Sequence, residues 1–251
     1  MKLAEKVAVV TGAGSGFGEG IARRLASEGA HVVVNDLREA ATAGVVRAIH
    51  DGGGKALSVP GDISSASVVD NVVTQAKVAF GRIDILVNNA GYTHTNQSLI
   101  TVSEEDFDRV FAVNVKSIYH FIRSVIPIMR SQGGGSIINL GSIGAIRPRP
   151  GLGWYCASKG AVITLTKTMA VEFASDRIRV NCICPSAGDT GMMLSSLGED
   201  TPERRARVLS TIPLGRFATP EDVAAMASFL SGDEASYLTG GVFPVDGGRG
   251  V

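Results

Sequence analysis

Residues 7–18 read VAVVTGAGSGFG, and this stretch decides the fold. Its first part, Val7–Val10, is a short β-branched run of the kind that forms buried parallel strands. Glycines follow at positions 12, 16 and 18, where they let the backbone turn tightly. A helical pattern comes next, and its apolar residues fall on one side at Ile21, Ala22, Leu25 and Ala26. The stretch therefore predicts a strand, a glycine-rich turn and a helix.

A second strand and an acidic residue complete this unit. Residues 31–36 read HVVVND, which predicts a strand that ends near the carboxylate of Asp36. The turn can bring the backbone close to a pyrophosphate at a helix N-terminus, and an acid about 20 residues further on can bind ribose hydroxyls. The glycine spacing is G-x-x-x-G-x-G rather than G-x-G-x-x-G. We expect a dinucleotide-binding unit, and a glycine-rich turn in another α/β protein is the alternative.

Strands and helices alternate along the rest of the chain. Ser64 and Ser103 are expected to cap the helices that follow them. Further strands are expected at residues 55–60, 83–87, 136–140, 179–184 and 241–245, and helices at 40–51, 64–80, about 103–129 and about 160–173. This alternation predicts an α/β fold with a doubly wound parallel β-sheet and helices on both faces. Since no linker or repeat interrupts it, residues 1–251 are expected to form a single domain.

The composition excludes several classes of protein. The 24 basic and 24 acidic residues balance, so neither a nucleic acid nor a membrane surface is an expected partner. The start of the chain lacks the apolar core of a signal peptide, and no apolar run is long enough to span a bilayer. Cys156, Cys182 and Cys184 lack C-x-x-C spacing and are expected to be buried, reduced thiols of a cytoplasmic protein. The four histidines share no metal-ligand spacing, so no metal site is predicted.

Tyr155 and Lys159 lie four residues apart in the sequence YCASK. On a helix this spacing places both side chains on one face. An ammonium near a phenol favours the phenolate, which would lower the tyrosine pKa and make it a proton donor near neutral pH. On its own the pair is more often a solvated helix face.

The motifs TGAGSGFG, NNAG and YCASK, together with Ser142, resemble the short-chain dehydrogenase/reductase family over nearly the whole chain. The resemblance implies that Tyr155 is the general acid/base. It implies that Lys159 lowers the pKa of that tyrosine and holds the nicotinamide ribose. Ser142 would orient the substrate oxygen, and Asn114 would anchor a water-linked proton relay. The structural alternatives are that Asn114 bonds a neighbouring backbone and that Ser142 caps a loop.

The resemblance also implies a cofactor site. Asp62 would contact adenine, with the capping of a turn as its structural alternative, and residues 88–91 would support the sheet and line the cofactor. The implied cofactor-binding residues are Gly12, Ser15, Gly16, Phe17, Gly18, Asp36, Asp62, Ile63, Asn89, Ala90, Gly91, Tyr155, Lys159, Pro185 and Thr190.

The residues around Asp36 predict a preference for NAD over NADP. A carboxylate can accept hydrogen bonds from both ribose hydroxyls, whereas a 2′-phosphate would place like charges at close range. Residues 13–15 of the glycine loop carry no positive charge. Arg38 is the counter-signal, because it could turn toward a phosphate or point into solvent.

The substrate region is less regular than the cofactor region. Ser186 stands where the family usually has glycine, so the wall near the nicotinamide carboxamide is expected to differ. Residues 189–211 combine methionines with charged residues and are expected to form a substrate lid. Arg147 and Arg149 suggest an anionic substrate, with solvated arginines or a subunit contact as the alternative.

We therefore predict an oxidoreductase that transfers a hydride between NAD and a secondary alcohol or ketone. An NADPH-dependent 3-oxoacyl thioester reductase, a sugar or polyol dehydrogenase and a non-catalytic dinucleotide-binding protein are the alternatives. The resemblance also implies a homotetramer. The part of the helix after Tyr155 expected at the subunit interface comprises Ile163, Thr166, Lys167, Ala170 and Val171.

Overall fold

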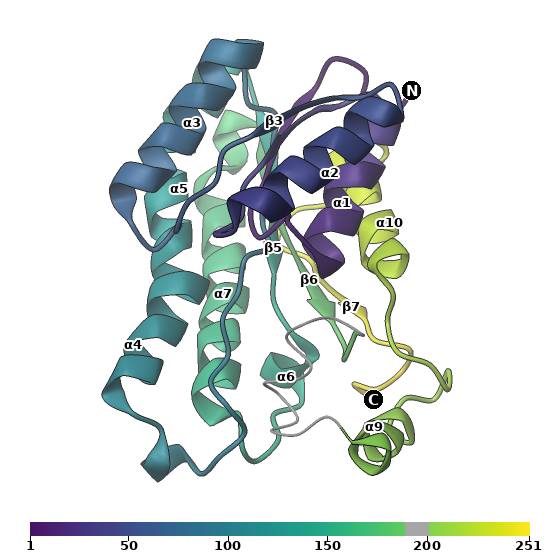
Figure 1. Cartoon of the computed structure of the whole chain (residues 1–251). Helices are drawn as coiled ribbons and strands as arrows, with labels where there is room; N and C mark the ends of the chain where they lie inside the picture. Colours follow the sequence, from purple (N-terminus) through teal and green to yellow (C-terminus); the bar gives the residue numbers. More distant parts are fainter. Residues whose placement is uncertain (189–200) are drawn as a thin grey trace.

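One parallel sheet organises the computed structural model, which describes residues 1–188 and 201–251 (Figure 1). The described residues contribute seven strands in the order β3-β2-β1-β4-β5-β6-β7, and every neighbouring pair is parallel. The strands are β1 (Val7–Val10), β2 (His31–Val34), β3 (Lys55–Ser58), β4 (Ile85–Asn88), β5 (Gly135–Leu140), β6 (Ile178–Pro185) and β7 (Val242–Val245). The predicted doubly wound fold is confirmed.

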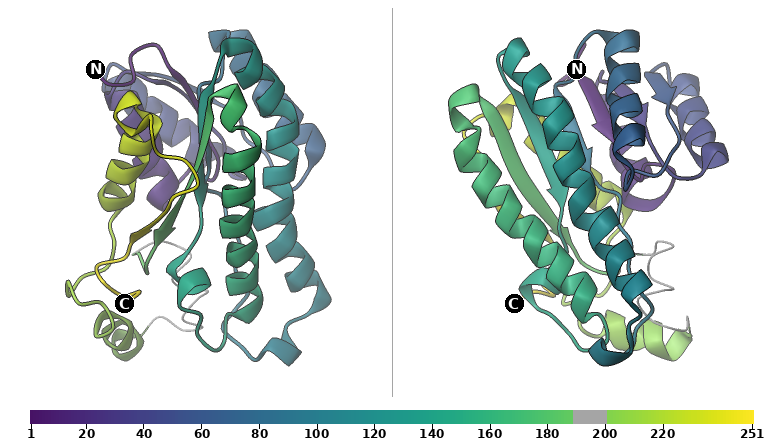
Figure 2. Two further views of the ribbon diagram at one scale, coloured as in Figure 1. Left: turned by 180° about the vertical axis from the view of Figure 1, so that it is seen from behind. Right: turned by 90° about the vertical axis from the view of Figure 1, so that its left-hand side faces the viewer.

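Helices cover both faces of this sheet (Figure 2). One face packs on α3, α5 and α7, and the other packs on α1, α2 and α10. The longer helices are α1 (Gly16–Ser27), α2 (Glu39–Asp51), α3 (Ala66–Phe80), α4 (Glu104–Phe111), α5 (Ser117–Gln132), α7 (Gly153–Glu172), α9 (Pro202–Leu209) and α10 (Pro220–Ser231). The shorter ones are α6 (Ile143–Ile146), η1 (Leu99–Thr101), η3 (Ala174–Asp176) and η4 (Asp233–Ala235), and a π-helical turn spans Ala112–Lys116.

The central strands β1 and β4 are buried on both faces, as their continuous apolar sequences predict, whereas the edge strands β3 and β7 are partly exposed. In β1, Val9 packs into the core on the α5 side, while Ala8 and Val10 pack into the core on the α1 side. In β4, Leu86 joins the first core and Ile85 joins the second. This alternation follows from the two-residue period of a strand and places a hydrophobic core on each side of the sheet.

The order of the strands reverses between β1 and β4. The chain moves outward from β1 to β3 and then returns to pair β4 with the other side of β1. In an open α/β sheet, such a reversal opens a crevice at the carboxyl ends of the strands, where ligands bind. The glycine loop after β1, the turn after β4 and the loop after β5 all reach this edge.

The helix starts agree with the sequence in one case and differ in another. Ser103 caps α4 as predicted, since its Oγ accepts a hydrogen bond of 3.1 Å from the backbone N–H of Asp106. The prediction that Ser64 caps the next helix is wrong, because Ser65 occupies the N-cap position of α3. The backbone N–H of Ser64 instead donates to the Asp62 carboxylate at 3.0 Å, which delays the start of the helix.

The expected subunit face of α7 is only partly exposed. Thr166 and Ala170 are buried in the core of the chain itself, so they cannot contribute to a surface. Lys167 and Val171 are exposed, and Val171 keeps 82% of its surface. Among the described residues, none of the helices is both long enough and apolar enough to cross a bilayer.

Candidate functional site

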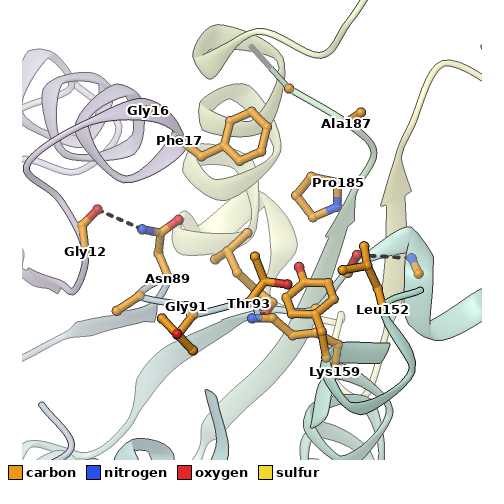
Figure 3. A pocket seen from close by; sticks show the side chains of 18 of the residues that line it. Gly12, Gly16, Phe17, Asn89, Gly91, Thr93, Leu152, Lys159, Pro185 and Ala187 are labelled. Atoms are coloured by element: carbon orange, nitrogen blue, oxygen red, sulfur yellow. Dashed lines mark hydrogen bonds between the residues drawn. The ribbon is translucent and has the colours of Figure 1, made fainter. Parts of the chain in front are cut away.

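A cavity of about 1020 Å³ opens at the carboxyl ends of the strands. Most of the sequence-predicted site residues lie together on its wall (Figure 3). Asn114 lies outside its lining, and Thr190 lies outside the described residues. The predicted residues that line it are Gly12, Ser15, Gly16, Phe17, Gly18, Asp36, Asp62, Ile63, Asn89, Ala90, Gly91, Ser142, Tyr155, Lys159 and Pro185.

The glycine loop is held against the turn that follows β4. The side-chain amide of Asn89 donates to the carbonyl oxygen of Thr11 at 2.8 Å. It also donates to the carbonyl oxygen of Gly12 at 3.0 Å (Figure 3). Gly12 has a φ of +60°, and a Cβ there would lie 2.7 Å from the Cα of Ala90. A Cβ on Gly18 would collide with the Gly12 carbonyl. Both positions therefore require glycine, and the close packing brings the loop and the start of α1 into the cavity wall.

Asp36 and Arg38 form one hydrogen-bonded group beside this loop. One carboxylate oxygen of Asp36 accepts the backbone N–H of Gly14 at 3.1 Å. The other accepts the backbone N–H of Arg38 at 3.1 Å and its Nε at 3.4 Å. The guanidinium of Arg38 also donates to the hydroxyl of Ser15 at 3.1 Å. Arg38 therefore lies across the glycine loop rather than pointing away from it.

Asp62 lies further along the same wall. Its carboxylate accepts the Ser64 backbone N–H and forms a 2.8 Å ion pair with Arg109. Burial opposes its ionisation, but the hydrogen bonds from Ser64 and the charge of Arg109 outweigh burial, so the pKa of Asp62 lies below its usual value. The residue thus caps a turn, as its structural alternative proposed, and also faces the cavity.

Tyr155 and Lys159 both lie on α7 and face the cavity, as their spacing predicts. The Lys159 ammonium is buried and donates to the Leu140 carbonyl at 2.7 Å. Burial lowers the pKa of Lys159 to about 8. Burial also raises the pKa of Tyr155 to about 12, against a hydrogen bond with Ser142 that lowers it. The predicted lowering of the tyrosine pKa by Lys159 is therefore wrong for the chain alone, because the ammonium is directed at β5 and burial dominates.

Ser142 follows β5 and begins α6. Its Oγ accepts the backbone N–H of Gly144 at 3.0 Å, so the residue caps this short helix. It also interacts with the phenol of Tyr155. The two functions are compatible, since the cap fixes the side chain of Ser142 beside Tyr155 while its hydroxyl proton can still be donated.

Asn114 lies in the π-helical turn and is buried. Its Oδ1 accepts the backbone N–H of Tyr92 at 2.8 Å, and its Nδ2 donates to the Tyr92 carbonyl at 3.0 Å. Nδ2 also donates to the Ser158 hydroxyl at 2.9 Å. Asn114 thus ties the segment after β4 to α7, which is the structural alternative that the sequence left open.

Ser186, which departs from the family pattern, and Gly188 both follow β6. A Cβ on Gly188 would collide with the ring of Phe17, so this position requires glycine. Figure 3 shows Phe17 on the side of the pocket that faces Pro185 and Ala187. Ser186 lines the cavity, and its buried Oγ has no hydrogen-bond partner among the described residues. A buried unpaired hydroxyl is costly, so a polar ligand group is expected at this wall.

These observations fit a dinucleotide. The glycine loop exposes backbone at a helix start, Asp36 offers carboxylate oxygens where a ribose would lie, and Ser186 offers an unpaired hydroxyl near the other end.

The cavity also contains three arginines that the sequence analysis did not assign to anion binding, although two of them lie in the expected lid segment. Arg204 and Arg207 come from α9, and Arg249 comes from the segment after β7. Each is distant in the sequence from Tyr155, and a lone arginine carries no motif. Only the fold brings them to the two arginines that the sequence did single out, Arg147 and Arg149.

Comparisons with known proteins agree with this site. A family profile described as Enoyl-(Acyl carrier protein) reductase matches residues 12–249. The chain is 46% identical over 252 residues to a 4-formylbenzenesulfonate dehydrogenase of Comamonas testosteroni, with 100% of both chains covered. It is 40% identical over 249 residues to a 3-oxoacyl-acyl-carrier-protein reductase of Thermotoga maritima, with 99% of each covered.

A solved structure gives the same result. The crystal structure of 3-ketoacyl-(acyl-carrier-protein) reductase from Brucella melitensis complexed with NADH has a TM-score of 0.93 and 43% sequence identity to this chain, covering 99% of this chain and 100% of that one. The similarity spans the cavity, the glycine loop and α7 together. The relatives act on alcohol or carbonyl compounds, and the solved neighbour binds a nicotinamide dinucleotide. This chain is therefore a nicotinamide-dependent oxidoreductase that belongs to the short-chain dehydrogenase/reductase family.

Proposed function

We propose that Ser142, Tyr155 and Lys159 carry out hydride-transfer chemistry on a secondary alcohol or ketone in this cavity. The observation that carries the proposal is that all three line the same cavity as the glycine loop and Asp36. A bound nicotinamide supplies or accepts the hydride. Ser142 donates a hydrogen bond to the substrate oxygen and stabilises the negative charge that develops there during reduction. Tyr155 gives its hydroxyl proton to that oxygen, and it takes the proton back during oxidation.

Lys159 and Asn114 support this proton transfer. The ammonium of Lys159 lies one helical turn from Tyr155, and its contact with Leu140 leaves further N–H groups for a ribose hydroxyl. Asn114 positions α7 through Ser158 and Tyr92 and is the proposed anchor of the water-linked relay. The residues proposed to hold the dinucleotide are those of the glycine loop, Asp36, Asp62 with Ile63, residues 89–91, Pro185 and Thr190.

We propose that NAD is the preferred cofactor. The carboxylate of Asp36 lies beside the glycine loop, and its negative charge opposes a 2′-phosphate. Arg38 is already paired with Asp36 and Ser15, so its charge is partly neutralised. An NADPH-dependent 3-oxoacyl thioester reductase is the second candidate, since two similar proteins are named as 3-oxoacyl- or 3-ketoacyl-(acyl-carrier-protein) reductases.

The test is a screen that follows reduced nicotinamide by its absorbance. Both cofactors are combined with a panel of secondary alcohols, diols, ketones and an acetoacetyl thioester. Oxidation of alcohols with NAD supports the main proposal. Turnover of the thioester with NADPH alone would support the second candidate. No turnover of any carbonyl or alcohol would contradict both.

We further propose a cytoplasmic homotetramer with a single domain over residues 1–251. Unpaired buried thiols at all three cysteines support a reducing compartment. Exposed apolar side chains on the neighbouring helices α5 and α7, Tyr119 and Val171, support pairing of these helices between subunits. Light scattering tests the tetramer, and a monomer at working concentration would refute it.

We also propose that residues 189–211 cover the substrate and that the substrate is anionic. Within the described part of this segment, α9 lines the cavity with Arg204 and Arg207. Protection from proteolysis by cofactor and substrate would support a cover, and equal cleavage with and without them would count against it. One similar protein is named for a sulfonated substrate.

A further inference from the structure

The charges on the cavity wall are unevenly distributed. Two carboxylates line the described part of the cavity, Asp36 and Asp62, and each is paired with an arginine, Arg38 and Arg109. The remaining wall, around Tyr155, contains five arginines and no carboxylate among the described lining residues. These arginines are Arg147, Arg149, Arg204, Arg207 and Arg249.

One edge of the Arg249 guanidinium is anchored beside this part of the cavity wall. Its Nε donates to the Thr211 hydroxyl at 2.9 Å, and that hydroxyl donates in turn to the carbonyl of Val208 in α9 at 2.6 Å. The two terminal nitrogens of Arg249 have no partner within the described residues. Fixing one edge of a guanidinium in this way leaves its other edge preorganised for a ligand.

The carboxylate of Asp246 favours the charged form of Arg249, but it does not outweigh burial and the neighbouring arginines. Both oxygens of Asp246 accept backbone N–H groups, from Gly248 at 3.0 Å and from Gly250 at 2.6 Å. Burial lowers the pKa of Arg249, and repulsion by Arg149 and Arg147 adds to this effect. Half-buried like charges that a carboxylate compensates only in part are unfavourable, and a bound anion relieves this repulsion.

Arg147 has a different role from its neighbours. Its Nη1 donates to the carbonyl oxygens of Arg249 at 2.9 Å and Val251 at 2.8 Å. These bonds fix the backbone that carries the Arg249 side chain. Arg149, in contrast, is exposed on the cavity wall and has no side-chain partner within the described residues.

We propose that Arg149 and Arg249 form an oxyanion subsite that binds a sulfonate or carboxylate group of the substrate, with Arg147 as a positioning residue. Two guanidinium forks can donate paired hydrogen bonds to either group. The inference rests on the proposed function, because it assigns the subsite to the substrate of the same cavity. It also makes the segment after β7 a determinant of substrate specificity.

The experiment measures ligand binding to the NAD-loaded enzyme by calorimetry. The probes are benzenesulfonate, benzoate and the neutral benzenesulfonamide. The wild-type enzyme is expected to bind benzenesulfonate or benzoate at least about 10-fold more tightly than benzenesulfonamide. Arg149→Gln and Arg249→Gln are each expected to reduce this preference about 10-fold, as for loss of a hydrogen bond to a charged group.

The control is Arg47→Gln, which makes the same charge change at an exposed site outside the cavity and should leave the preference unchanged. Equal binding of charged and neutral probes, or no binding of any probe, would overturn the proposal. An equal loss of all probes in the Arg249 variant would also overturn it, since that result indicates a structural role. Comparing benzenesulfonate with benzoate distinguishes the two anions. Tyr155→Phe distinguishes this inference from the proposed function. Normal turnover in that variant would contradict the proposed function, whereas its preference for anionic probes would still support the subsite.

Discussion

Replacing Asp36 with asparagine removes one charge beside the glycine loop while preserving its shape. The amide oxygen of Asp36→Asn can still accept the Gly14 backbone N–H that the carboxylate accepts at 3.1 Å. The Asp36 side chain is only 13% exposed, so water screens its charge incompletely. A unit charge at about 4 Å from a 2′-phosphate costs about 1 kcal/mol in water and about 4 kcal/mol at an effective dielectric constant of about 20. Removal of the carboxylate also frees Arg38, whose Nε lies 3.4 Å from it, to bind the phosphate.

The expected result is a change in cofactor selectivity. Each 1.4 kcal/mol is about tenfold. In Asp36→Asn, the ratio of kcat/KM for NAD to kcat/KM for NADP should therefore decrease by a factor of about 5 to about 1,000. Steady-state rates with both cofactors and one substrate measure it. The control is Glu39→Gln, which removes an exposed charge from the first turn of α2 outside the cavity. An unchanged ratio in Asp36→Asn, or a preference of the wild-type enzyme for NADP, would refute the reasoning.

Three further changes test other parts of the site. Tyr155→Phe removes the proton donor but keeps the ring, so turnover should fall about 10²- to 10⁴-fold with cofactor binding retained; near-normal turnover would contradict the assignment. In the wild-type chain, the pKa of Lys159 is about 8 when folded and 10.5 when unfolded. Between these pH values the unfolded state binds more protons than the folded state. The contribution of this group to the free energy of unfolding should therefore increase by about 3 kcal/mol as pH rises from about 8 to 10.5. Denaturant titrations of Lys159→Met should lack that gain, and an identical pH dependence would disprove the buried ammonium. Gly188→Ala should weaken NAD binding and cost about 1–3 kcal/mol of stability through contact with Phe17, with partial rescue by Phe17→Leu. Gly160→Ala, which meets open space on α7, should be neutral or stabilising by comparison.

Local sequence patterns were sufficient to predict the strands of the sheet, because β-branched runs favour strands and glycines favour turns through residues that are close in the sequence. The ends of the strands were less predictable. The strand expected at residues 31–36 ends at Val34, since the side chain of Asn35 donates to the Val59 carbonyl and Asp36 turns toward Gly14. The N-cap of α3 is Ser65 rather than the predicted Ser64 for a similar reason, because the backbone N–H of Ser64 donates to the Asp62 carboxylate.

The site could be predicted where residues lie on one element and not where distant elements meet. The four-residue spacing placed Tyr155 and Lys159 on one face of α7, but it could not indicate that Lys159 would donate to Leu140 of β5. Arg249 shows the same limit. Its contact with Thr211 joins segments 38 residues apart, and only packing of the whole chain brings it to Arg149.

The π-helical turn at Ala112–Lys116 has a consequence for how this chain can tolerate insertions and deletions. Such a turn contains one residue more than an α-helical turn over the same span. Deletion of a single residue there would restore a regular helix and rotate the residues on one side by about 100° relative to the other. Asn114 would then lose its contacts with Tyr92 and Ser158, or α5 would turn its apolar face away from the sheet. We expect this segment not to tolerate changes in length, so a deletion scan across α4 and α5 should show a sharp minimum in folded yield at 112–116.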